Sequence, residues 1–160
     1  MTSKTLIQPV VMITGAAGGL GTELIRAFSE DEYQVFATSR TVPEKSEGRV
    51  VWHQLDVTND VQCREAMVAG FDQFGRIDVL INNASGYTGG KTIAEMSEAD
   101  IDTELAVTLR APIYLSKLYV ELARAQQSGK IIFISSYRRT AWRTRLQTPQ
   151  RVLGSQSWLD

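Results

Sequence analysis

One stretch decides the fold: Val10-Val11-Met12-Ile13-Thr14-Gly15-Ala16-Ala17-Gly18-Gly19-Leu20-Gly21, an apolar run that breaks into glycines and then enters a helical pattern. Its spacing predicts a strand, a tight turn and the start of a helix. Gly15, Gly19 and Gly21 permit backbone angles that side chains forbid, and they let the main chain approach a bulky anion closely. The turn is therefore a candidate pyrophosphate site. The alternative is a tight strand–helix connection that binds nothing.

Composition limits the classes of function. The chain has 160 residues, of which 43% are hydrophobic and 22% charged, and its net charge is −1. It is long enough to bury one sizeable core. A chain with a net charge this close to zero lacks the excess positive charge that attracts nucleic acid or an anionic membrane. Its apolar runs are too short to span a bilayer and its first residues do not resemble a signal peptide, so we expect a cytoplasmic protein. The single cysteine, Cys63, cannot form an internal disulfide, and the sequence contains no recognisable metal-binding motif.

Hydrophobic periodicity predicts alternating strands and helices along the rest of the chain. After the first strand and turn, strands are predicted over 34–39, 50–55, 77–81 and 129–136, and helices over 20–31, 60–74 and 97–126. Pro112 is expected to bend the long last helix. The strand over 129–136 is a continuous apolar run, which is typical of strands buried on both faces of a parallel sheet. The pattern predicts an α/β fold with a doubly wound, Rossmann-like parallel sheet that is C-terminally incomplete, with five of its strands present.

Several ordered motifs resemble those of the short-chain dehydrogenases/reductases. Three segments carry the resemblance: Thr14-Gly15-x-x-x-Gly19-x-Gly21 is similar to the glycine motif of the family, Asn82-Asn83-Ala84-Ser85 to its Asn-Asn-Ala-Gly segment, and Ile134-Ser135-Ser136 to its Ile-Ser-Ser segment. The resemblance covers about residues 8–136. It implies a Rossmann-like fold, a nicotinamide dinucleotide cofactor, and hydride transfer between that cofactor and a small carbonyl or alcohol substrate.

The predicted second strand ends in Ser39-Arg40, where a dinucleotide fold meets the adenosine ribose. An acidic residue at this place bonds the 2′-hydroxyl of NAD, whereas arginine accommodates the 2′-phosphate of NADP. Arg40, with Ser39 as a hydroxyl donor, therefore favours NADP over NAD. The alternative is that Arg40 is an ordinary solvated charge.

The resemblance also implies roles for individual residues. Asp56 corresponds to an aspartate that contacts the adenine ring, although Asp56, Thr58 or Asn59 could instead cap the following helix. Ser136 corresponds to the catalytic serine, which binds the substrate carbonyl oxygen as charge develops; turn formation is the alternative for this serine. The implied cofactor-binding residues are Thr14, Gly15, Gly19, Leu20, Gly21, Ser39, Arg40, Asp56, Val57, Asn83, Ala84 and Ser85.

The chain departs from the family pattern in three places. Ser85 replaces a glycine, and Thr108 stands where the family has an asparagine that helps to organise the active site. Beyond the serine the family has Tyr-x-x-x-Lys, in which the ammonium lowers the pKa of the phenol for proton exchange. Residues 137–160 contain no lysine. The same spacing occurs earlier, from Tyr87 to Lys91, but two glycines within it disfavour the helix that the pair would need.

Residues 137–160 differ in composition from the rest of the chain, with five arginines against the single Asp160. We therefore divide the chain into a Rossmann-like NAD(P)-binding domain, residues 1–136, and an atypical Arg-rich tail, residues 137–160. A basic nucleic-acid arm and a truncated or frame-shifted continuation are alternative interpretations of the tail.

Two functions stay open at this point. The chain is either an NADP-dependent oxidoreductase of the short-chain type or a catalytically inactive fragment that acts at most as an NADP-binding module. Members of the family commonly pair through the long helix that corresponds to residues 97–126 and through the helix that follows it, which this sequence lacks. A homo-oligomer is thus one possibility, and the oligomeric state stays open.

Overall fold

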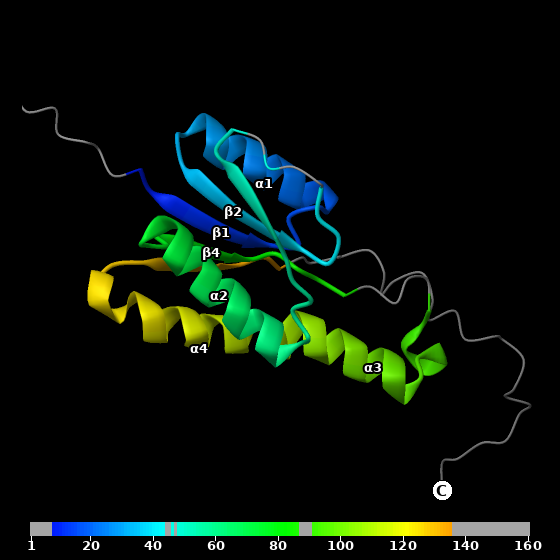
Figure 1. Cartoon of the computed structure of the whole chain (residues 1–160). Coiled ribbons are helices and arrows are strands. Elements are labelled where there is room, and N and C mark those ends of the chain that lie inside the picture. The colour runs from blue at the N-terminus through cyan, green and yellow to red at the C-terminus, as the bar shows by residue number, and fades with distance from the viewer. Residues whose placement is uncertain (1–7, 44–45, 47, 87–90, 136–160) are drawn as a thin grey trace, which may run out of the picture.

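The structure is a computed structural model that describes residues 8–43, 46, 48–86 and 91–135. At its centre is a 5-stranded parallel sheet in the order β3-β2-β1-β4-β5 (Figure 1). The strands are β1 (Val10–Thr14), β2 (Gln34–Ser39), β3 (Val50–Gln54), β4 (Val79–Asn82) and β5 (Lys130–Phe133). Ser136, the residues from Tyr87 to Gly90, and the tail over 137–160 lie outside the described residues.

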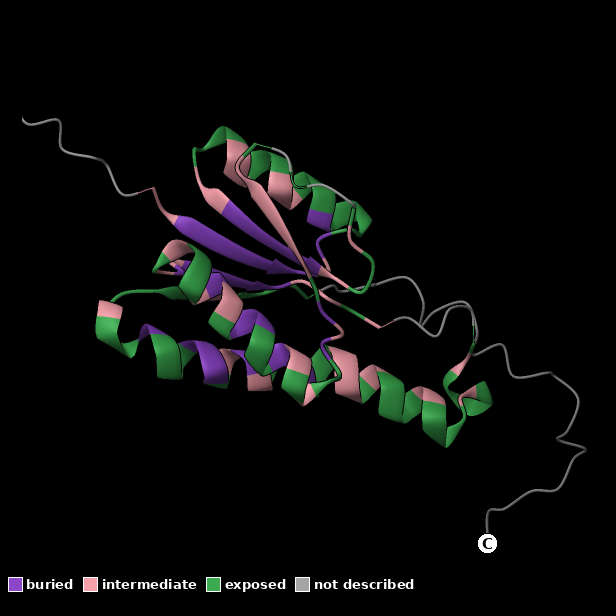
Figure 2. Ribbon diagram, in the orientation of Figure 1, coloured by how far each residue is buried: buried purple, intermediate pink, exposed green. Residues whose placement is uncertain are grey.

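Helices cover both faces of this sheet, as the sequence predicts for a doubly wound fold. Helix α1 (Gly19–Glu30) lies on one face, and α2 (Asp60–Phe74) and α4 (Ala111–Ala123) lie on the other (Figure 1). The α1 face packs on Val11 and Ile13 of β1, while the opposite face packs on Val10 and Met12. This alternation follows from the two-residue period of a strand that is covered on both sides. Figure 2 shows the buried residues gathered in the central strands between the two helical layers.

The ends of α2 follow from local sequence. The Asn59 side chain accepts hydrogen bonds from the backbone N–H groups of Val61 and Gln62, at 3.0 and 3.1 Å, and so caps the first turn. Gly75 ends the helix in the left-handed region, with φ of 73°, a conformation that glycine adopts without strain. The helix predicted over 60–74 is confirmed, and Asn59 is the residue that caps it.

The long helix predicted over 97–126 divides into several parts. After the short turn η1 (Ile93–Glu95), the chain forms α3 (Glu98–Leu105), the π-helical turn η2 (Ala106–Arg110), α4, and the turn η3 (Arg124–Gln126). At the junction the Ala111 N–H donates to the carbonyl of Ala106, five residues earlier. Pro112 follows directly and has no N–H to donate. The disturbance expected at Pro112 thus takes the form of a π-helical turn just ahead of it.

The expectation that the last strand is buried on both faces is wrong. Ile132 is 39% exposed and Phe133 is 57% exposed, although Ile131 packs against the core beneath α4. These side chains are exposed because β5 lies at one edge of the sheet, where, among the described strands, it pairs with β4 alone. Helix α1 packs against β1 and β2 and does not cover β5. Within the described ranges, no strand lies on the outer side of β5.

Candidate functional site

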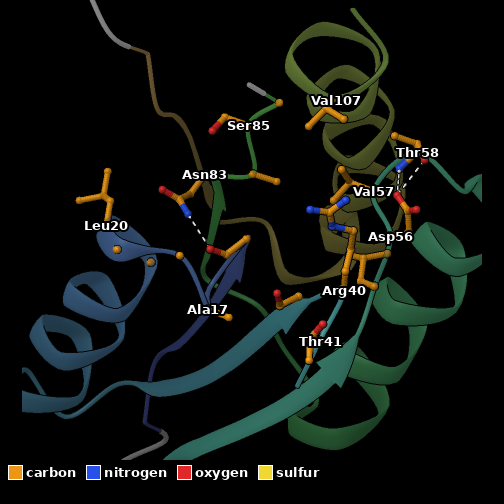
Figure 3. Close-up of a pocket in the computed structure, with 18 of the residues that line it drawn as sticks. Ala17, Leu20, Arg40, Thr41, Asp56, Val57, Thr58, Asn83, Ser85 and Val107 are labelled. Carbon is orange, nitrogen blue, oxygen red and sulfur yellow. Dashed lines mark hydrogen bonds between the residues drawn. The ribbon is translucent and has the colours of Figure 1, made fainter. Parts of the chain in front are cut away.

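A pocket of about 760 Å³ opens at the carboxyl ends of the parallel strands (Figure 3). Its walls come from the turn after β1, the residues that follow β2 and β3, the loop after β4, and the helical stretch that includes α3 and η2. From β1 the sheet extends through β2 and β3 on one side and through β4 and β5 on the other. The direction in which successive strands are added therefore reverses between β1 and β4. Ligands of doubly wound folds bind at such a switch point.

The three motif glycines play different steric roles in the turn. A Cβ on Gly15, whose φ is +63°, would lie 2.8 Å from Ala84 Cα, and a Cβ on Gly21 would lie 2.5 Å from the Gly15 carbonyl oxygen. These two glycines therefore allow backbone segments to pack against each other. A Cβ on Gly19 would meet no atom within 4 Å, so this position leaves open space at the start of α1.

The start of α1 is suited to an anion. Gly18 occupies the N-cap position, and no side chain caps the helix there. The first N–H groups of a helix lack intrahelical partners, and the helix dipole places partial positive charge at this end. Backbone N–H groups beside the open space at Gly19 are the donors that a pyrophosphate requires. The turn therefore fits the group that its sequence predicts.

Thr14 fixes the loop after β4 against the glycine turn. It is buried, and its Oγ1 accepts hydrogen bonds from the backbone N–H groups of Asn83 and Ala84, both at 3.0 Å. The same hydroxyl donates to the Ile81 carbonyl at 3.4 Å. The Asn83 amide donates in return to the carbonyls of Thr14 and Gly15, at 2.9 and 3.1 Å. Thr14 thus positions the two loops and is not itself part of the pocket wall.

Arg40 and Asp56 place opposite charges at the β2–β3 end of the pocket. Asp56 Oδ1 accepts hydrogen bonds from the backbone N–H and the hydroxyl of Thr58, at 2.9 and 2.7 Å. These bonds, with a smaller contribution from the Arg40 charge, lower the pKa of Asp56 from its ordinary value. Asp56 is therefore ionised at neutral pH. Arg40 is exposed and forms no ion pair with another described residue, so its guanidinium is available to an anion.

The pocket brings together every predicted cofactor-binding residue except Thr14. The residues that line it as expected are Gly15, Gly19, Leu20, Gly21, Ser39, Arg40, Asp56, Val57, Asn83, Ala84 and Ser85. Their role in binding a cofactor stays a prediction. Thr108 does not line the pocket, and its hydroxyl donates to the Glu104 carbonyl four residues earlier. The predicted catalytic serine, Ser136, lies outside the described residues.

Sequence reasoning missed several residues of the pocket wall. Thr41 follows Arg40 directly, and its place beside a predicted site residue was the available signal. Thr103 and Val107 lie one helical turn apart and close the pocket over the loop after β4. A spacing of four residues occurs on one face of every helix, so it does not mark these two as site residues. Only the packing of their helical stretch against the loop after β4 identifies them.

Two further properties concern the described part of the chain alone. None of its helices has the length and apolar character needed to cross a membrane. It also contains no group of three or more His, Cys, Asp and Glu side chains that could hold a metal ion.

A sequence model of the short chain dehydrogenases matches residues 9–142. The chain belongs to this family. Oxidoreductase BOA17 of Botryotinia fuckeliana is 35% identical to it over 132 residues, which cover 78% of this chain and 47% of the relative. A 3-ketodihydrosphingosine reductase of Bacteroides thetaiotaomicron is 34% identical over 131 residues, which cover 81% of this chain and 48% of that protein.

The fold agrees with solved short-chain dehydrogenase structures. A metagenomic short-chain oxidoreductase in complex with NADP superposes with a TM-score of 0.74 at 28% identity, over 82% of this chain and 63% of that one. The chain spans about half the length of the curated relatives that it matches. The family and the Rossmann-like fold are thereby established.

Proposed function

We propose that this chain binds NADP(H) and forms the cofactor-binding part of an oxidoreductase that moves a hydride between NADP(H) and a small carbonyl or alcohol substrate. One observation carries the proposal. The glycine turn, the free Arg40 guanidinium and the ionised Asp56 meet in one pocket at the switch point of the sheet. The family of oxidoreductases and the NADP complex of a structural neighbour support this assignment.

The pocket residues divide among the chemical groups of the cofactor. Backbone N–H groups at the glycine turn would hold the pyrophosphate. Arg40 would hold the 2′-phosphate, with the hydroxyls of Ser39 and Thr41 as further donors, because guanidinium pairs strongly with phosphate oxygens. Asp56 and Val57 would face the adenine ring, and the carboxylate can accept a hydrogen bond from its amino group.

The chemistry of the reaction has two sources. A bound nicotinamide supplies the hydride acceptor or donor, and the protein supplies orientation and electrostatics. Of the chain's own groups, Ser136 would donate a hydrogen bond to the substrate oxygen and stabilise the charge that develops there. Because the sequence from 137 to 160 holds no lysine, we propose no Tyr-x-x-x-Lys proton donor in the segment after Ser136.

That last observation favours a second candidate function, in which this chain by itself binds NADP(H) without turnover. The two candidates make different predictions for one experiment. Purified chain is mixed with NADPH and a panel of small aldehydes and ketones, and NADPH absorbance is followed. Consumption of NADPH that depends on both the chain and the carbonyl supports the oxidoreductase. Tight NADPH binding with no consumption supports the binding module.

The cofactor preference is tested by a charge deletion. We expect Arg40→Ala to weaken NADPH binding roughly tenfold or more, since a charge-assisted hydrogen bond contributes about 1.5–3 kcal/mol. NADH has no 2′-phosphate, so its affinity should change little. Arg124→Ala, an equal loss of charge at an exposed arginine in η3, outside the pocket wall, is the matched control. Equal losses for NADPH and NADH in Arg40→Ala would remove Arg40 from the phosphate site.

We also propose a homo-oligomer. The helical stretch α3–η2–α4 exposes large apolar side chains, with Leu105 at 50%, Leu109 at 56% and Ile113 at 60%. These residues line one shallow groove between Asp102 and Lys117. Apolar surface of this kind favours association, and sedimentation velocity of the purified chain measures it.

A further inference from the structure

An ion pair joins the start of α2 to the end of η2, although its two residues are 50 positions apart in the sequence. Arg110 donates from Nη1 to Asp60 Oδ1 and from Nη2 to Asp60 Oδ2, both at 2.7 Å. Two parallel bonds of this kind fix the direction of a guanidinium as well as its distance. The hydrogen bonds from Arg110 also lower the pKa of Asp60 from its ordinary value, so both partners are charged at neutral pH.

Tyr114 of α4 adds further contacts to the same junction. The Arg110 guanidinium lies over the Tyr114 ring, 5.8 Å from the ring centroid. On the α2 side, Arg64 donates from Nη2 to the Tyr114 hydroxyl at 3.3 Å. A guanidinium that stacks on a ring and pairs with a carboxylate is restrained by both partners. Side chains of α2, η2 and α4 therefore meet in one cluster around Arg110.

The α2 end of this ion pair is connected to one wall of the pocket. Asp60 is the first residue of α2 and closely follows residues 56–58, which line the pocket. The Asp56 backbone N–H donates to Gln62 Oε1 at 2.8 Å, and the Asn59 N–H donates to the Asp56 carbonyl at 3.0 Å. These bonds tie the wall to the first turn of α2. A shift of that turn would therefore move residues 56–58 with it.

The other end of the ion pair is connected to a second wall. Arg110 ends the helical stretch whose Thr103 and Val107 line the pocket. Within the described chain no residue of α3 or η2 is buried, whereas α4 has five buried residues. The stretch α3–η2 thus lacks the buried anchors that hold α4. Figure 3 shows Val107 on the same side of the pocket as Val57 and Thr58, so the ion pair joins two walls at one end of the pocket.

We propose that Asp60 and Arg110 are positioning residues, which hold the wall that carries Val107 against the wall formed by residues 56–58. The inference rests on the proposed function, which places the adenine ring beside Asp56 and Val57. Neither side chain of the pair lines the pocket, so the pair acts through the walls and not by touching the cofactor. It should therefore affect NADPH and NADH alike, since both carry the adenine ring.

The test is a double-mutant cycle on cofactor affinity. Dissociation constants for NADPH and NADH are measured by isothermal titration calorimetry with the unaltered chain, Asp60→Asn, Arg110→Gln and the double variant. We expect each single variant to bind both cofactors roughly twofold to fivefold more weakly, which corresponds to about 0.4–1 kcal/mol, the range of an exposed ion pair. The double variant should lose no more affinity than a single variant, because either substitution alone already breaks the pair.

Arg26→Gln is the matched control. It removes an arginine whose side chain is 61% exposed, against 56% for Arg110, and whose ion pairs lie within α1 alone. Its affinity for both cofactors should stay unchanged. All titrations are made below the unfolding transition of each variant, which thermal unfolding locates, so a loss of stability alone does not alter the affinity.

Three results would overturn the positioning role while the unaltered chain still binds NADPH, which leaves the proposed function standing. The first is unchanged affinity in both single variants. The second is a loss confined to NADPH, which would place Arg110 at the 2′-phosphate instead. The third is a double variant whose loss is the sum of the single losses. Failure of the unaltered chain to bind either cofactor would overturn the proposed function, and the inference with it.

Discussion

Two glycines of the same turn should respond in opposite ways to the same substitution. A Cβ on Gly21 would lie 2.5 Å from the Gly15 carbonyl oxygen and 2.6 Å from the Ala16 carbonyl oxygen. Both contacts involve backbone, which cannot rotate aside. A Cβ on Gly19 would meet nothing within 4 Å. We therefore expect Gly21→Ala to damage the fold and Gly19→Ala to leave the fold intact while obstructing the pocket.

The expected magnitudes follow from these distances. Overpacking of a tight site costs about 1–3 kcal/mol, and contacts with rigid backbone put Gly21→Ala at about 3 kcal/mol. For a chain of this size each kcal/mol lowers Tm by roughly 2–4 °C, so its Tm should fall by roughly 6–12 °C. Alanine is favoured over glycine within a helix by about 0.5–1 kcal/mol. Gly19 is the first residue of α1, so the Tm of Gly19→Ala should not fall.

The assay pairs stability with binding. Thermal unfolding followed by circular dichroism gives Tm for the unaltered chain and both variants, and NADPH fluorescence titration gives affinity below the transition. We expect Gly19→Ala to lose NADPH affinity roughly tenfold, because its methyl group occupies the space in front of the helix N-terminus. An unchanged Tm in Gly21→Ala would refute the packing argument. Unchanged NADPH affinity in a folded Gly19→Ala would refute the placement of the pyrophosphate.

Two further predictions concern buried groups beside the pocket. Thr14→Val removes the acceptor of both N–H groups in the Asn83–Ala84 turn and should lower the free energy of unfolding by about 2 kcal/mol in urea denaturation. Burial raises the pKa of the Cys63 thiol from 9.0 to about 11. The thiol of the unfolded chain ionises first as pH rises. The free energy of unfolding should therefore fall between pH 9 and about 11, by up to roughly 2.7 kcal/mol relative to Cys63→Ala.

Each of these predictions has its own control. Thr14→Ser keeps the hydroxyl, so it should lose less stability than Thr14→Val if the hydrogen bonds matter more than the methyl group. Equal losses in the two variants would contradict the role given to the hydroxyl.

For Cys63, lysines and tyrosines also titrate at alkaline pH, and the comparison with Cys63→Ala cancels their contribution. Identical pH profiles for the two proteins would show that the thiol is not buried as described.

Local patterns in the sequence predict most of the fold. Alternating apolar runs and helical periods identify four of the strands and the helices α1 and α2 near their observed ends, because their signals are contained within single segments. The form of the long helix is less predictable. Pro112 indicates a disturbance, but the shift to π-helical hydrogen bonding at Ala106–Arg110 depends on how the helix packs against its surroundings. The exposure of Phe133 depends on which elements cover β5.

The sequence by itself determines the glycine turn, the family and the charged residue after β2, since each is a pattern of neighbouring residues. Only the tertiary structure decides that Thr14 is a buried anchor rather than part of the pocket wall, and that Val107 closes the pocket from a distant helix. It also decides that the loop after β4 approaches the side chains of Glu104 and Val107 closely at Gly86. The physical reason is that contacts between segments far apart in the chain depend on topology and packing, which no local spacing of residues encodes.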